Sequence, residues 1–162
     1  MKYRVRPFSR DDHRTVVDIF NYYVVNSQTA FPEEPISYEY AEKLMAGGAG
    51  LPFLAVQDGE DVVGFGLLRP YSLVPSFAHT AEVTCFIDPG HTGKGIGTEL
   101  YGELFAWGVQ AGVRVVLASI ASTNVGSIAF HERMGFKQCG CFEGVLRKNG
   151  QDQDVVWMQR SL

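Results

Sequence analysis

The residues with the clearest chemical meaning are three glycines at alternate positions near the middle of the chain. Gly93, Gly95 and Gly97 follow an Asp-Pro-Gly stop signal at residues 88–90 and come just before a stretch with helical periodicity. Glycine leaves backbone N–H groups free to point inward, and the start of a helix adds positive potential. The segment therefore predicts a cradle for an anion, most naturally a phosphate group.

Two well-known phosphate loops do not fit this segment. A Walker A loop requires Gly at the position of Asp88, and Ser or Thr where Gly95 follows Lys94. The dinucleotide fingerprint G-x-G-x-x-G fails as well, because Thr98 or Leu100 occupies its third glycine position. A tight strand-to-helix turn without a ligand is the alternative, although such a turn requires fewer glycines.

A second polar segment begins at Asn124, before another stretch with helical periodicity. Asn124 and Ser127 are three residues apart, so their side chains share a face of the first helical turn and can both bind a ligand. A simple helix cap is the alternative for Asn124. Together the two segments resemble the acetyl-CoA-binding segments of the GCN5-related N-acetyltransferase superfamily, with Thr92 in place of the usual Gln or Arg.

The resemblance implies that the chain uses acetyl-CoA as a co-substrate and transfers its acetyl group without a metal. Backbone amides of the loop and of the helix start would hold the CoA pyrophosphate, at Gly93, Lys94, Gly95, Gly97 and Thr98. Asn124 and Ser127 would belong to the same cofactor site. The backbones of Phe86 and Ile87 would pair with the pantetheine arm as with an added strand.

Acetyl transfer to an amine needs a base for the amine, a donor for the thioester oxygen and an acid for the leaving thiolate. Glu82 is an acid in an otherwise apolar strand, where a carboxylate needs a partner or a function. The resemblance makes Glu82 the general base, with a structural salt bridge as the alternative. His131 takes the position of a tyrosine that protonates the thiolate in this superfamily, with a packed, hydrogen-bonded histidine as the alternative.

Within the superfamily the chain most resembles the phosphinothricin acetyltransferase group, which also acylates methionine sulfoximine. The resemblance rests on residues 19–24, the Phe31-x-Glu33 pair and residues 80–82. It implies a homodimer whose acceptor is a small amine, namely an amino acid or an analogue such as methionine sulfoximine, methionine sulfone or phosphinothricin. Paired arginines that this group often carries are missing from residues 71–75, and Arg69 is the nearby cation.

Four aromatic residues are candidates for the wall of the acceptor pocket: Tyr22, Tyr23, Phe31 and Tyr71. Core packing is the alternative for them. Two other functions also remain open at this stage, a non-catalytic CoA-binding sensor and a protein N-acetyltransferase. A sensor has no need for both Glu82 and His131, so these two residues favour an enzyme.

The elements that position these residues follow from periodicity and stop signals. Strands are expected at residues 3–6, 53–56, 62–68 and 80–87, with helices after Ser9 and Ser37. A helix from residue 96 to 107 precedes an apolar run at 113–119, which is typical of a strand buried on both faces. A helix from Asn124 to Gly135 and strands near 141–146 and 154–158 complete the chain. This order predicts a mixed α/β sheet. The resemblance adds the acyl-CoA N-acyltransferase fold, a mostly antiparallel sheet with a central parallel strand pair and flanking helices.

The composition is that of one ordinary domain, residues 1–162, with 46% hydrophobic and 20% charged residues. The net charge of -4 argues against nucleic acid as a partner. No uncharged apolar run approaches the ~18 residues of a membrane span. Three cysteines, an odd number, favour a reduced cytoplasmic setting. Cys139-x-Cys141 lacks a second pair, so no metal site is expected.

Overall fold

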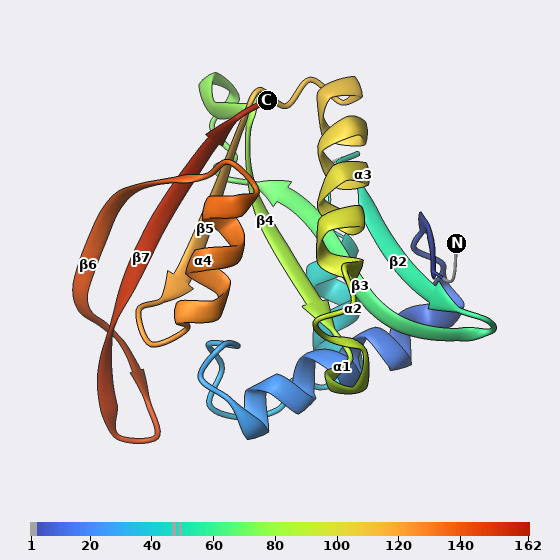
Figure 1. Ribbon diagram of the computed structural model, residues 1–162, viewed down its shortest axis with the longest axis horizontal. Helices are drawn as coiled ribbons and strands as arrows, with labels where there is room; N and C mark the ends of the chain where they lie inside the picture. Colours follow the sequence, from blue (N-terminus) through green and yellow to red (C-terminus); the bar gives the residue numbers. More distant parts are fainter. Residues whose placement is uncertain (1–2, 47, 49) are drawn as a thin grey trace.

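The computed structural model describes residues 3–46, 48 and 50–162. Its strands and longer helices are, in chain order, β1 (Tyr3–Pro7), α1 (His13–Asn26), α2 (Tyr38–Ala46), β2 (Phe53–Asp58), β3 (Asp61–Pro70), β4 (Thr80–Ile87), α3 (Ile96–Gln110), β5 (Val115–Ala121), α4 (Val125–Arg133), β6 (Lys137–Lys148) and β7 (Gln151–Ser161). The strands form one seven-stranded sheet in the order β1-β2-β3-β4-β5-β7-β6 (Figure 1). Only β4 and β5 pair in parallel. The predicted mixed sheet with a central parallel pair and flanking helices is therefore confirmed.

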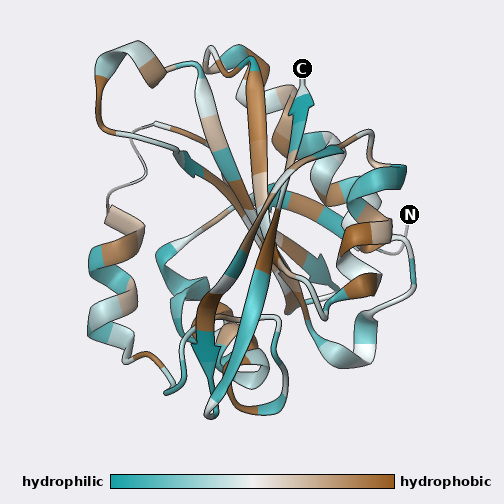
Figure 2. Ribbon diagram, turned by 90° about the vertical axis from the view of Figure 1, so that its left-hand side faces the viewer, coloured by the Kyte–Doolittle hydropathy of each residue, from teal (hydrophilic) through white to brown (hydrophobic). Residues whose placement is uncertain are grey.

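Helices cover both faces of the sheet. α3 buries Leu100 and Leu104 against one face, and α1 packs Val16 against Phe65 of β3. A Cβ at the neighbouring Gly66 would point at the leucines of α3, so α1 and α3 lie on opposite faces because strand residues alternate. Figure 2 shows apolar segments along the central strands between these layers. No helix in the described part of the chain is long and apolar enough to cross a membrane.

The first helix is fixed by polar contacts at its start. The Ser9 side chain accepts the Asp11 N–H, while Asp12 accepts the Ser9 N–H, which together make a capping box. Asp12 also receives two bonds from the Arg6 guanidinium on β1, at 2.6 and 2.7 Å. This bidentate pair lowers the pKa of Asp12. These contacts fix the start of α1 against β1. Further along the helix, Tyr23 reaches Ile87 of β4.

The parallel contact between β4 and β5 is short and then opens into a gap. The two strands pair only where Thr80–Glu82 lies beside Val115–Leu117. Beyond these pairs they diverge toward the bottom of the view in Figure 1. β4 continues to pair with β3 along its whole length. The rest of β4, residues 83–87, therefore has one edge that pairs with no strand. We call this edge the seam.

A buried lysine ties the loop after α1 to the β6–β7 hairpin. Lys148 ends β6 and is 0% exposed. Its Nζ donates to the carbonyls of Val24, Ser27 and Ala30 at 2.9, 2.9 and 2.6 Å. Burial lowers the pKa of Lys148, while three acceptors use all three protons of the ammonium form. Lys148 therefore holds the loop that carries Phe31 and is not available to a substrate.

Candidate active site

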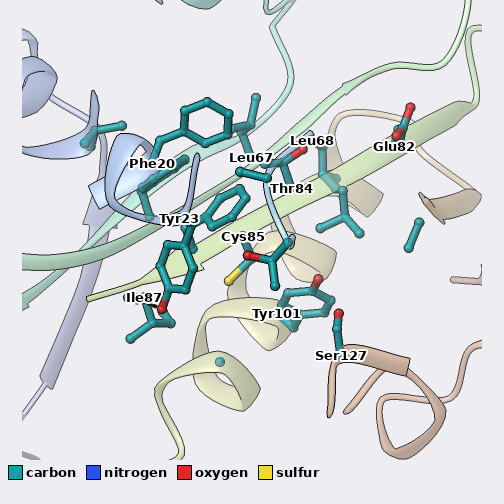
Figure 3. Close-up of a pocket in the computed structure, with 18 of the residues that line it drawn as sticks. Phe20, Tyr23, Leu67, Leu68, Glu82, Thr84, Cys85, Ile87, Tyr101 and Ser127 are labelled. Atoms are coloured by element: carbon teal, nitrogen blue, oxygen red, sulfur yellow. Dashed lines mark hydrogen bonds between the residues drawn. The ribbon is translucent and has the colours of Figure 1, made fainter. Parts of the chain in front are cut away.

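A cavity of about 1340 Å³ follows the seam and extends to the start of α3. It is lined by residues of α1, β3, β4, the glycine loop, α3, β5 and α4, part of which Figure 3 shows. It brings together most of the predicted site residues, namely Phe31, Glu82, Phe86, Ile87, Gly93, Gly95, Gly97, Thr98, Asn124, Ser127 and His131. Residues that are distant in the sequence thus share one space.

The glycine loop has the geometry of an anion cradle. Gly93 and Gly95 have φ values of 72° and 84°, which is left-handed backbone that glycine adopts without strain. Gly95 is also the N-cap of α3, where the positive end of the helix dipole faces the cavity. The amides of Gly93, Lys94, Gly95 and Gly97 donate to no acceptor among the described residues. Their N–H groups are therefore free for a negatively charged ligand.

Two residues of the predicted cradle behave differently. The Thr98 N–H donates to the Gly95 carbonyl at 3.1 Å, so it serves the first turn of α3 and not the cradle. The Lys94 side chain turns back to the Gly90 carbonyl at 2.6 Å and does not line the cavity. The prediction for Thr98 is corrected on this ground, and that for Lys94 is limited to its backbone amide.

The backbone direction of β4 follows from its pairing with β3. The register between the two strands is continuous, with no bulge. At its two ends, Tyr71 N–H donates to the Thr80 carbonyl and Asp88 N–H donates to the Val63 carbonyl. Backbone groups alternate sides along a strand, so the even-numbered residues of β4 bond to β3.

The backbone N–H and C=O groups of the odd-numbered residues of β4 consequently face the seam. Past the parallel pairs, these are Val83, Cys85 and Ile87. The prediction that Phe86 pairs its backbone with a ligand is therefore corrected, because its N–H and C=O face β3. The Phe86 ring lies on the α1 side of the sheet, 5.1 Å from the Phe20 ring.

Tyr23 of α1 reaches the same edge. Its hydroxyl donates to the Ile87 carbonyl at 2.5 Å. Figure 3 shows the Tyr23 side chain beside Ile87. Burial raises the pKa of Tyr23, so the hydroxyl stays protonated. Tyr23 therefore covers one acceptor at the glycine-loop end of the seam, and the N–H of Ile87 remains directed at the cavity.

Glu82 lies at the other end of β4, where the strands begin to diverge (Figure 3). Its Oε1 accepts from Arg69 Nη2 and from Ser119 Oγ, each at 2.8 Å. The Glu82 side chain is 12% exposed and lines the cavity. Glu82 thus forms the salt bridge that was the alternative to a general base, and its Oε2 has no protein donor among the described residues.

His131 is packed and hydrogen-bonded on both ring nitrogens. Nδ1 lies 2.7 Å from the Ser127 carbonyl, which can only accept, so Nδ1 carries the proton. Nε2 of the neutral ring then accepts from the Tyr101 hydroxyl at 2.9 Å. Burial lowers the pKa of His131 from its ordinary value. The structure therefore favours the packed histidine, and the hydroxyl that lines the cavity here belongs to Tyr101.

Stability is expected to fall below about pH 6.5 because of His131. The pKa of this residue is 6.5 in its ordinary state and lower in the folded chain. Between these two values the unfolded chain binds the extra proton more readily, so the free energy of unfolding decreases as the pH falls. The loss should be shallower in a His131→Gln variant, measured by urea unfolding between about pH 5 and pH 7. His79→Gln, at an exposed position, should keep the slope of the parent; equal slopes for all three proteins contradict the prediction.

Asn124 and Cys85 have simple roles in this geometry. The Asn124 side chain accepts the Ser127 N–H at 3.2 Å, so it caps α4 while lining the cavity. Burial raises the pKa of the Cys85 thiol to about 12. A thiol that stays protonated is a poor nucleophile, so transfer through an acyl-cysteine at Cys85 is disfavoured.

Of the predicted acceptor-site aromatics, Tyr23 and Phe31 line the cavity. Tyr22 is 45% exposed on the outer face of α1, because the next residue, Tyr23, takes the inward position. Tyr71 is also 45% exposed and packs on Phe77 in the loop after β3, at a ring distance of 5.6 Å. The predictions for Tyr22 and Tyr71 are therefore wrong.

Tyr101 and Ser119 line the cavity and were not predicted for the site, while Arg69 was noted there only as a nearby cation. Tyr101 lies on a helical stripe that is equally typical of core residues. Ser119 is the last residue of the apolar run 113–119 that predicts β5. Its polar side chain is the one sign in the sequence that it could belong to the site. The contact of Arg69 with Glu82 depends on the register of two strands.

The comparisons with known proteins agree with this geometry. A model of the acetyltransferase (GNAT) family matches residues 16–136, and the chain therefore belongs to this family. The chain is 30% identical to phosphinothricin N-acetyltransferase of Streptomyces coelicolor, over 98% of this chain and 96% of the relative. It is 26% identical to the L-methionine sulfoximine/L-methionine sulfone acetyltransferase of Salmonella typhimurium, over 98% and 94%. The predicted family and subgroup resemblance are thus confirmed.

Two solved structures are similar over nearly the whole chain. A phosphinothricin acetyltransferase from Sinorhizobium meliloti, solved in complex with AcCoA, has a TM-score of 0.93 and 28% identity, covering 100% of this chain and 89% of that one. A ribosomal-protein-alanine N-acetyltransferase from Brucella melitensis has a TM-score of 0.93 and 28% identity, covering 98% and 99%. The fold is therefore shared by enzymes whose acceptors differ.

Proposed function

We propose that the chain transfers the acetyl group of acetyl-CoA to the amine of a small amino acid or amino-acid analogue. The observation that carries the proposal is a single cavity with an anion cradle at one end and a carboxylate that is 12% exposed at the other. Relatives from Streptomyces coelicolor and Salmonella typhimurium act on phosphinothricin and on methionine sulfoximine or sulfone, which supports this acceptor class.

The glycine loop and the seam fit acetyl-CoA. The free amides of Gly93, Gly95 and Gly97 would hold the pyrophosphate at the positive end of α3. The backbone groups of Val83 and Cys85 would pair with the amides of the pantetheine arm, as an added strand does. The thioester would then lie beside β4, between the cradle and Glu82.

The catalytic steps follow from the groups along this path. Glu82 would take the proton of the amine at Oε2, directly or through water, while Arg69 and Ser119 hold Oε1 and fix the carboxylate. A seam-facing N–H of β4 that does not pair with the pantetheine arm would bond the thioester oxygen as it becomes negative. The Tyr101 hydroxyl donates to His131 Nε2 in this structure and would turn its O–H toward the leaving thiolate. The C–N bond forms as the C–S bond breaks, and the thiolate takes a proton from water while Glu82 returns its proton to water, so the step balances.

The acceptor end of the cavity favours an uncharged side chain. Phe31 and Ile36 line the cavity, and Lys148 is held by three carbonyls. We therefore expect a higher kcat/KM for methionine sulfone than for phosphinothricin, by roughly tenfold for each ~1.4 kcal/mol of missing ion pairing. Steady-state kinetics on both acceptors tests this order, and a better rate with phosphinothricin contradicts it.

Thiol release from acetyl-CoA with a panel of amines tests the proposed function itself. The panel includes methionine sulfone, methionine sulfoximine, phosphinothricin, spermidine and a peptide with an N-terminal alanine. Release with the amino-acid analogues is the expected result. Preference for the peptide indicates a protein N-acetyltransferase, and acetyl-CoA binding without release indicates a sensor. The homodimer and the cytoplasmic location implied by the resemblance stay predictions.

A further inference from the structure

The arginine beside Glu82 has more donors than the fold uses. Arg69 on β3 lies directly opposite Glu82 on β4, and its Nη2 donates to Glu82 Oε1 at 2.8 Å. A guanidinium carries five N–H donors, and this is the one bond that Arg69 makes among the described side chains. Its side chain is 54% exposed and lines the cavity. The remaining donors are therefore open to a ligand.

The Arg69–Glu82 pair presents two opposite charges side by side. Their bonded atoms are 2.8 Å apart, at one place on the cavity wall. In an α-amino acid the amine nitrogen and a carboxylate oxygen are also roughly 3 Å apart, as standard bond lengths require. An amino acid can thus turn its amine toward Glu82 and its carboxylate toward Arg69 at the same time. A planar guanidinium suits the carboxylate because it can donate two parallel bonds.

No second cation lies near Glu82 in the described part of the cavity wall. The other arginine or lysine that lines the cavity is Arg133, at the end of α4 and 6.0 Å from the Phe130 ring. Gly97 of the cradle faces the same Phe130 ring, at 3.2 Å from a Cβ built there. Arg133 therefore belongs to the cradle end, and Arg69 is the candidate for a carboxylate next to the base.

We propose that Arg69 binds the α-carboxylate of the acceptor, so that the enzyme selects α-amino acids over amines without a carboxylate. The inference rests on the proposed function, because the acceptor amine must approach Glu82. In this arrangement Arg69 keeps its bond to Oε1 and uses its free N–H groups for the substrate. The same contact orients the amine toward Oε2 of Glu82, which is the oxygen without a protein donor.

The test uses two acceptors that differ only in the carboxylate, methionine sulfone and 3-(methylsulfonyl)propylamine. The parent enzyme should show a higher kcat/KM for methionine sulfone. Arg69→Gln should lower kcat/KM for methionine sulfone by roughly 10- to 100-fold, the range for hydrogen bonds to a charged group. The value for the amine should fall less, because it loses only the contact of Arg69 with Glu82, so the ratio of the two kcat/KM values should fall. Arg69→Lys, which keeps the charge, should give an intermediate loss.

A matched control removes another cross-strand ion pair. Arg147 faces Asp152 across β6 and β7 at 2.9 Å, and neither residue lines the cavity. Arg147→Gln should leave the ratio of the two kcat/KM values unchanged. If Arg69→Gln lowers both values equally, Arg69 acts only on Glu82 and the inference is overturned. If the parent enzyme acetylates neither acceptor, the proposed function fails and the inference with it.

Discussion

Replacing Glu82 with glutamine is expected to lower the turnover number by roughly 10²–10⁴-fold, the usual contribution of a positioned general base. Glutamine has nearly the shape of glutamate, and its amide oxygen can still accept from Arg69 and Ser119. The fold and the affinity for acetyl-CoA should therefore stay close to those of the parent. The loss should shrink as the pH rises, because more of the amine is then unprotonated without help.

Steady-state kinetics with a small amino-acid acceptor measures this effect, and calorimetry with acetyl-CoA checks the binding. Glu103→Gln is the matched control, since Glu103 is an exposed acid on α3 outside the cavity. It should leave the turnover number unchanged. Equal turnover for parent and Glu82→Gln at neutral pH would rule out Glu82 as the base. The ion pair with Arg69 would then be a purely structural contact.

Gly95→Val is expected to weaken acetyl-CoA binding by roughly 100-fold. No atom lies within 4 Å of a Cβ built at Gly95, so the new side chain would occupy the space that the pyrophosphate must approach. Loss of two hydrogen bonds to a charged ligand accounts for about 3 kcal/mol or more, which is at least this change in Kd. Calorimetric titration with acetyl-CoA measures the Kd.

Valine at Gly95 also adds backbone strain, because φ is 84° there. Gly112 provides a matched control at the other end of α3, with a φ of 90° and no atom within 4 Å of a built Cβ. Gly112→Val should lose similar stability and keep the parent's Kd, since Gly112 does not line the cavity. Unchanged binding in a folded Gly95→Val protein means that the phosphate cradle lies elsewhere.

The strands that are buried were predicted more closely than those at the exposed edge. The apolar run at 113–119 predicts a central strand, and β5 spans Val115–Ala121. The segment expected near 141–146 is instead β6, which spans Lys137–Lys148. This strand is mostly exposed and its register shifts twice, between Gln138 and Gly140 and between Phe142 and Leu146. Its period-2 pattern is therefore blurred, and the sequence shows only its middle.

The candidate site was predictable where local backbone geometry decides it. The spacing of Gly93 and Gly95 alone indicates a loop with left-handed residues. The inward position of Tyr23 depends on how α1 lies against β4, 64 residues further along the chain. The Arg69–Glu82 pair likewise needs the register of β3 and β4. Contacts of this kind arise from tertiary packing, which one sequence does not display.

Because the pairing between β4 and β5 is short, the stability of the folded chain should depend on whether a ligand lies in the seam. The two halves of the sheet are joined by the short pairing of Thr80–Glu82 with Val115–Leu117 and by bonds to the His79 carbonyl just before it. A pantetheine arm in the seam would extend that connection and would be part of what holds the folded chain together. At a hundredfold excess over its Kd, a ligand adds about 2.7 kcal/mol to the free energy of unfolding. The resistance of this enzyme to heat and to proteases would then rise and fall with the supply of acetyl-CoA.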